Sequence, residues 1–145
     1  MIERTGIAIL IIGLAVGSYQ IFTRWQVARL SRRKSEDGLL GMLKPGIPGV
    51  IYFWSESCAP CKLVQKPALE QLQSDLGPEG VQVVAVNALE RPELADAWGV
   101  LGLPTTFIVD SSGQPRRVNH GVVRAEHLKR QIELADSGRP MQQVA

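Results

Sequence analysis

The sequence contains little cysteine, few aromatic residues and almost no excess of charge. Two cysteines in 145 residues exclude a scaffold held by several disulfides and a zinc or iron–sulfur site with four cysteine ligands. A net charge of +2 gives no overall reason to expect nucleic acid as a partner. The length suits one domain rather than two, and residues 35–145 are enough to bury a core without disulfides or metal.

The small net charge hides two unlike regions. Residues 1–34 contain six lysines and arginines against one acidic residue, whereas residues 35–145 contain ten against thirteen. Residues 5–23 contain no charged residue, and as a helix they would extend roughly 28 Å, close to the thickness of the hydrocarbon core of a bilayer. We therefore predict that residues 1–34 form a single-pass membrane anchor with a basic juxtamembrane segment, and that residues 5–23 contact lipid.

Two alternatives to a retained anchor fit the same residues. A buried core helix is disfavoured by the length of the uncharged stretch. A cleaved signal peptide is the stronger alternative, because Ala15-Val16-Gly17 has the pattern of small residues of a cleavage site. Against cleavage, the uncharged stretch continues for six residues beyond Gly17, and the segment before it carries only Arg4, offset by Glu3.

The basic residues predict an orientation for the anchor. Five of them follow the uncharged stretch and one precedes it, and short flanks rich in lysine and arginine tend to stay cytoplasmic. This predicts a catalytic domain on the cytoplasmic side. The alternative is the extracytoplasmic or periplasmic side, because a basic segment can also lie against anionic headgroups.

The remaining sequence predicts a linker, one α/β domain and a tail. Residues 35–49 contain closely spaced prolines and glycines and one possible helical turn, residues 50–138 form the domain, and residues 139–145 form the tail. Hydrophobic patterning in the domain predicts a mixed sheet with helices on both faces. The predicted strands are 50–54, 81–86, 105–109 and, at an edge, 115–119. One helix is predicted to start at the cysteines and end near residue 76, and two more are predicted over residues 93–98 and 124–135.

The two cysteines lie three residues apart where the first predicted strand is followed by a helix. Residues with this spacing share a helical face, at a separation that a disulfide can bridge. Cys58 falls at the helix N-terminus, where free backbone N–H groups favour its thiolate, so it is the predicted nucleophile. Cys61 lies one turn further, where it can attack a mixed disulfide and release the product.

Three other interpretations of the pair are weaker. A permanent disulfide enclosing two residues would restrict the unfolded chain little. A metal site would need further ligands, and His120 and His127 show no matching pattern, so both are taken as structural or surface residues. Idle buried thiols fit poorly with a cysteine pair that begins a helix after a buried strand. Redox chemistry is the preferred interpretation.

Two segments together resemble the thioredoxin family over about residues 50–135. The stretch from Phe53 to Lys62, FWSESCAPCK, is similar to the family's active-site stretch F-W-A-x-W-C-G-P-C-K, and Leu103-Pro104-Thr105 is similar to its segment ending in P-T. The resemblance implies a three-layer thioredoxin-like fold with Pro104 in the cis form beside the cysteines. It also implies that the backbone of Leu103 pairs with an extended substrate. The residues expected to contact substrate are Leu103, Pro104, Trp54, Ala59 and Pro60, although packing is the preferred explanation for Trp54.

The sequence departs from the family pattern at several positions. Ser57 replaces the tryptophan before the first cysteine, so one wall of the docking surface is missing. Tyr52 replaces a buried acid, and a phenol is a poor base at neutral pH. Pro67 comes one residue later than the common spacing, which puts the local helix geometry in doubt. The family's first strand is hard to find, so the fold is expected to lack it.

These observations predict a thiol–disulfide oxidoreductase that reduces protein disulfides at a membrane surface through Cys58 and Cys61. Its partners would be protein disulfide or dithiol substrates and an unidentified electron donor, without a bound cofactor or metal. One alternative is an extracytoplasmic thioredoxin-like reductant of the kind used in cytochrome c maturation. The other is a redox-inactive thioredoxin-fold binding module, which the changes at Ser57 and Tyr52 would permit.

Overall fold

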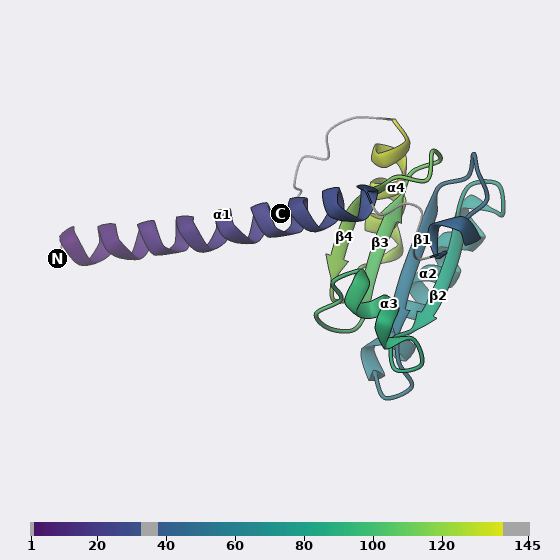
Figure 1. Ribbon diagram of the computed structural model, residues 1–145, viewed down its shortest axis with the longest axis horizontal. Helices are drawn as coiled ribbons and strands as arrows, with labels where there is room; N and C mark the ends of the chain where they lie inside the picture. Colours follow the sequence, from purple (N-terminus) through teal and green to yellow (C-terminus); the bar gives the residue numbers. More distant parts are fainter. Residues whose placement is uncertain (1, 33–37, 138–145) are drawn as a thin grey trace.

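A four-stranded mixed sheet forms the centre of the protein (Figure 1). The computed structural model describes the backbone of residues 2–32 and 38–137 and the side chains of residues 11–26 and 38–137. The predicted tail at residues 139–145 lies outside the described residues. The strand order is β2-β1-β3-β4, with β1 parallel to β2 and the other pairs antiparallel. The strands are β1 (Gly49–Trp54), β2 (Gln82–Asn87), β3 (Thr105–Val109) and β4 (Pro115–His120).

Helices cover both faces of the sheet, as predicted from the sequence. The helices α2 (Lys66–Leu76) and α4 (Ala125–Asp136) pack on one face, and α3 (Pro92–Ala97) and the short 3-10 helix η1 (Leu40–Met42) pack on the other. The ends of α3, of α4 and of each strand lie within one residue of their predicted positions. Their accuracy follows from strong hydrophobic patterning bounded by proline and glycine.

The central strand β1 contributes to two separate cores. Val50 and Tyr52 face α2 and α4, whereas Ile51 and Phe53 face α3, and none of these four is more than 5% exposed. Alternate side chains of a strand point to opposite faces of its sheet, so a strand covered on both faces must be apolar throughout. This explains why the run from Val50 to Phe53 is continuous rather than alternating.

No strand precedes β1 within the described residues, so β2 forms one edge of the sheet. The segment before β1 is bonded to the first residue of β2. The side chain of Gln82 donates to the carbonyl oxygens of Lys44 and Ile47 at 2.9 and 2.8 Å, and the backbone N–H of Lys44 donates to Gln82 Oε1 at 2.8 Å. One side chain thus ties the linker to the start of the β1–β2 pair, where Gln82 lies opposite Gly49.

The N-terminal helix α1 (Ile2–Arg32) continues without a break beyond the predicted membrane span. Its N-terminal part projects away from the domain, and its C-terminal part contacts β4 (Figure 1). Gln26, in the segment predicted to be juxtamembrane, is 6% exposed and packs against the domain. In the part of α1 whose side chains are described, no stretch is long and apolar enough to qualify as a membrane span. Residues 5–10 of the predicted span lie outside that part.

Candidate active site at the end of the first strand

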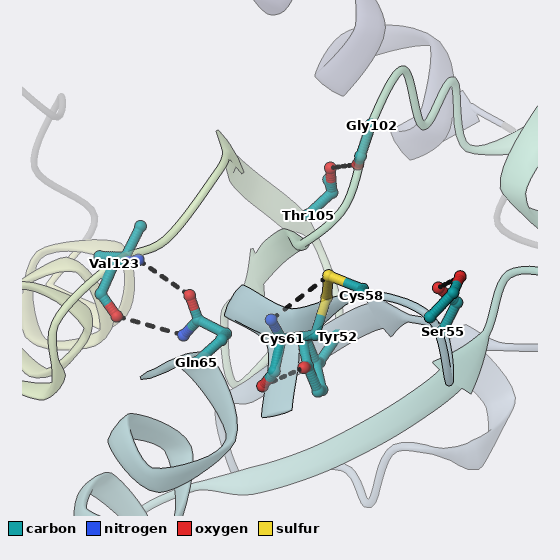
Figure 2. The surroundings of a disulfide bond; sticks show 9 residues. Tyr52, Ser55, Cys58, Cys61, Gln65, Gly102, Thr105 and Val123 are labelled. Carbon is teal, nitrogen blue, oxygen red and sulfur yellow. Dashed lines mark hydrogen bonds between the residues drawn. A yellow bond between two sulfur atoms is a disulfide. The ribbon is translucent and has the colours of Figure 1, made fainter. Parts of the chain in front are cut away.

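The two cysteines lie at the C-terminal end of β1, where the chain turns into a helix (Figure 2). They form a disulfide with an S–S distance of 2.04 Å and a Cα–Cα distance of 5.3 Å. Cys58 is partly exposed, whereas Cys61 is fully buried. The burial matches the predicted division of roles, because only the outer sulfur is open to an incoming disulfide, but the roles themselves remain predictions.

One backbone N–H at the helix start points at the sulfur of the outer cysteine. The N–H of Cys61 donates to Cys58 Sγ at 3.3 Å, and the N–H of Lys62 donates to the carbonyl oxygen of Cys58 at 3.4 Å. Hydrogen bonds and the helix dipole at such a position favour a thiolate over a thiol. The ammonium of Lys62, the residue after Cys61, pairs with Glu56 at 2.7 Å on the surface.

A π-turn interrupts the helix just after its first residues. Residues Cys61–Gln65 form a π-helix, in which the N–H of Lys66 donates to the carbonyl oxygen of Cys61 five residues earlier. A π-turn accommodates one extra residue in a helix, and such turns occur frequently at functional sites. The extra residue explains why Pro67 comes later than the family spacing: Pro67 lies in the first turn of α2, where its missing N–H costs no hydrogen bond.

Tyr52 bonds to the backbone of the second cysteine. Its hydroxyl donates to the carbonyl oxygen of Cys61 at 3.0 Å, and its side chain lies in the core below the disulfide (Figure 2). Burial raises the pKa of Tyr52 to about 12, so the group is a neutral donor at physiological pH. The sequence indicated only that a base is missing at this position. The structure adds that the phenol holds the carbonyl of the π-turn.

Gln65 is a buried polar residue that the sequence interpretation missed. It is fully buried, and its amide bonds to both backbone groups of Val123: Nε2 donates to the carbonyl at 3.1 Å, and Oε1 accepts from the N–H at 2.8 Å (Figure 2). These bonds connect the π-turn to the loop before α4. A glutamine four residues after Cys61, on the same helical face, was the signal that could have revealed it.

The loop before β3 passes beside the disulfide (Figure 2). The Leu103–Pro104 bond is cis, as the resemblance implies, and Pro104 is buried. The loop is held by two hydrogen bonds: Thr105 Oγ1 donates to the carbonyl of Gly102 at 2.6 Å, and the N–H of Gly121 donates to the carbonyl of Pro104 at 2.8 Å. Leu103 packs against both cores.

The remaining predicted substrate contacts differ in their exposure. Ala59 and Pro60 are exposed next to Cys58, whereas Trp54 is half-buried and packs against the core below α2 and α4. Ser57 is exposed where the family pattern has tryptophan, so the residue before Cys58 provides no large side chain. Substrate contact by these residues remains a prediction.

The histidines and acidic residues offer no metal site among the described residues. No group of three or more histidine, cysteine, aspartate or glutamate side chains comes together there. His127 is exposed on α4, whereas both ring nitrogens of His120 are buried without a hydrogen-bond partner. Burial lowers the pKa of His120, which keeps the ring neutral at physiological pH.

Comparison with known proteins places the domain in a family. The family model described as thioredoxin matches residues 42–134. The chain belongs to the thioredoxin family. It is 40% identical to a thioredoxin of Rhodospirillum rubrum over 94 residues, which cover 65% of this chain and 88% of that protein.

Two further relatives extend the comparison. Over 103 residues the chain is 26% identical to the thiol-disulfide oxidoreductase ResA of Geobacillus thermodenitrificans, covering 56% of this chain and 59% of that protein. The crystal structure of oxidised mitochondrial thioredoxin 3 from Saccharomyces cerevisiae matches with a TM-score of 0.53 and 27% identity, covering 62% of this chain and 79% of that one. The thioredoxin-like fold is therefore established for the domain.

Proposed function

We propose that this protein is a thiol–disulfide oxidoreductase that reduces protein disulfides through Cys58 and Cys61. The observation that carries the proposal is the position of Cys58 Sγ. It is partly exposed, accepts the N–H of Cys61 at a helix N-terminus, and is bonded to a buried second sulfur. Kinship with thioredoxins and with a thiol-disulfide oxidoreductase supports the same chemistry.

The reduced pair would act in two displacement steps. The thiolate of Cys58 attacks one sulfur of the substrate disulfide, so a mixed disulfide forms and one substrate thiolate leaves and takes up a proton. The thiolate of Cys61 then attacks Cys58 Sγ and expels the second substrate thiolate. Two electrons have passed from the dithiol to the substrate, and the Cys58–Cys61 disulfide remains. An external dithiol donor must reduce it before another cycle.

Cys61→Ser tests the two roles. With Cys61 absent, the substrate stays attached to Cys58, and we expect a covalent adduct that mass spectrometry detects and dithiothreitol releases. Cys58→Ser is the matched control and should form no such adduct. A binding module would retain its partner noncovalently in both variants. That outcome would overturn the proposed chemistry.

We also propose that α1 anchors the domain to a membrane. The support is the absence of charge in residues 5–23 and the exposure of four apolar side chains in the part of α1 that projects from the domain, Ile11, Ile12, Leu14 and Val16. Retention of the full chain in the membrane pellet after alkaline carbonate washing would support the anchor. Release into the supernatant would refute it.

The excess of basic residues after the uncharged stretch favours a domain on the cytoplasmic side. Labelling Cys58 with a membrane-impermeant maleimide after mild reduction of intact cells tests this orientation. We expect labelling only after the membrane is permeabilised. Labelling of intact cells would place the domain outside and favour the extracytoplasmic reductant.

A further inference from the structure

A hollow lies where α1 meets the loop that carries the cis proline. Its volume is about 320 Å³, near the lower limit for sites that bind small molecules, and it is open to solvent on one side. None of the six described residues that line it is charged. They come from α1 (Tyr19), the loop before β3 (Leu101, Gly102, Leu103) and the end of β4 (His120, Gly121).

Gln26 fixes the position of α1 relative to this loop. Its side-chain Nε2 donates to the carbonyl oxygens of Trp98 and Gly99, both at 2.7 Å, where α3 ends and the loop begins. Gly99 has a φ of 65°, and a Cβ there would lie 2.7 Å from Gln26 Nε2, so glycine is needed for both the turn and the contact. Tyr19 lies two turns earlier on the same helical face, about 10 Å along the axis, and faces the rest of the loop.

The hollow continues the surface beside the cysteines. Leu103 lines the hollow and also packs, together with Cys58, against the core below α2 and α4. Gly121, which also lines the hollow, donates its backbone N–H to the carbonyl oxygen of Pro104. A polypeptide that pairs with the backbone of Leu103 would therefore run past the hollow while its disulfide meets Cys58.

We propose that Tyr19 and residues 101–103 form a subsite for an apolar side chain of the substrate polypeptide. Tyr19 lies four residues before the end of the uncharged stretch, at the level of the membrane–water interface, where tyrosine side chains are favoured. The earlier part of α1 then serves as the tether, and Tyr19 belongs to the substrate-binding surface. This inference rests on the proposed function. An extended chain added beside an existing backbone gains affinity from main-chain hydrogen bonds and specificity from pockets that take alternate side chains. Tyr19 provides a wall on a surface where Ser57 provides none.

The chemistry of the lining favours an apolar occupant. Among the lining side chains only Tyr19 and His120 carry polar atoms. The ring nitrogens of His120 are buried, and burial keeps this ring neutral by lowering its pKa. A charged substrate side chain would find no partner of opposite charge among the lining residues and would lose water on entry. Leucine or methionine would bury apolar area against Tyr19, Leu101 and Leu103.

Single-turnover reduction of peptide disulfides tests the subsite. The full chain, reduced beforehand and held in lipid nanodiscs, is mixed with either of two synthetic peptide disulfides. One carries leucine at all positions within two residues of its cysteine, and the other carries serine there. We expect the second-order rate constant to be about tenfold higher for the leucine peptide. In Tyr19→Ala most of this preference should disappear, and in Tyr19→Phe it should remain.

The controls separate this inference from the proposed function. Ile21, 70% exposed, lies on a different face of α1, and Ile21→Ala should keep the preference. Bis(2-hydroxyethyl) disulfide is too small to fill the hollow and should react equally with all these variants. No reaction of the wild type with it would contradict the proposed function itself. The subsite would be overturned if the wild type and Tyr19→Ala showed the same preference for the leucine peptide. It would also be overturned if Tyr19→Ala reduced both peptides faster, because α1 would then cover the substrate-binding surface.

Discussion

Phe53 and Tyr52 are neighbours on β1, yet they point to opposite faces of the sheet into different surroundings. Phe53 packs against Trp98 and Phe107, with ring centroids 6.2 and 5.8 Å away. Tyr52 lies on the face that carries Cys61 and uses its hydroxyl to hold the π-turn. Gln65 is a second buried polar residue connected to that turn. The α3 face packs aromatic rings, whereas the other face combines packing with the positioning of the site.

This difference predicts that substitutions on the α3 face change mainly the stability of the fold, whereas substitutions on the face that carries Cys61 change mainly its chemistry. A substitution in the aromatic cluster should change the free energy of unfolding and leave the cysteine chemistry of folded molecules intact. A substitution at Tyr52 or Gln65 should have a smaller effect on stability but change how the π-turn presents Cys61. Three predictions test this separation.

Phe107→Ala should have the largest effect on stability. Its ring is fully buried, and its centroid lies 4.9 Å from that of Trp98, so truncation leaves a cavity and should cost about 3–5 kcal/mol. Urea denaturation of the oxidised protein measures this loss, and Phe107→Leu supplies a milder variant if the first fails to fold. The rate at which reduced, folded protein attacks a small disulfide should not change. A changed rate would mean that the two faces are not independent.

Gln65→Met should have an intermediate effect on stability. Methionine has a similar length but leaves both backbone groups of Val123 without their partners, which should cost about 2–3 kcal/mol. The step in which Cys61 displaces the mixed disulfide should also slow, because the π-turn is no longer tied to the loop before α4. Gln73→Met, at an exposed position of α2, is the matched control. A loss of stability with an unchanged displacement rate would make Gln65 purely structural.

Tyr52→Phe should have the smallest effect at neutral pH, about 1 kcal/mol for one hydrogen bond. Its pH dependence is more specific. Because the folded pKa is about 12 and the ordinary pKa of tyrosine is 10.0, the wild type should lose stability as the pH rises from about 10 to 12. Tyr52→Phe should lack this part of the alkaline loss. Parallel urea midpoints for the two proteins across that range would contradict burial of an un-ionised phenol.

Much of the domain could be predicted from the sequence because its signals are local. The apolar run 50–54, the cysteine spacing and the turn residues each depend on neighbours along the chain, and the corresponding elements are present. Pro104 required the resemblance, since a proline by itself does not reveal a cis bond. The π-turn was visible only as a proline one residue too late, without an indication of how the helix would accommodate it.

The sequence by itself determined that a helix begins at a cysteine pair after a buried strand, because hydrophobic period, turn chemistry and residue spacing act over a few residues. Only the tertiary structure decided that Tyr52 donates to Cys61, that Gln65 bonds to Val123 58 residues away, and that Gln26 reaches Trp98 72 residues away. These contacts depend on where packed elements bring distant backbone groups. Hydrophobic periodicity along the chain does not show which distant backbone groups will lie next to one another.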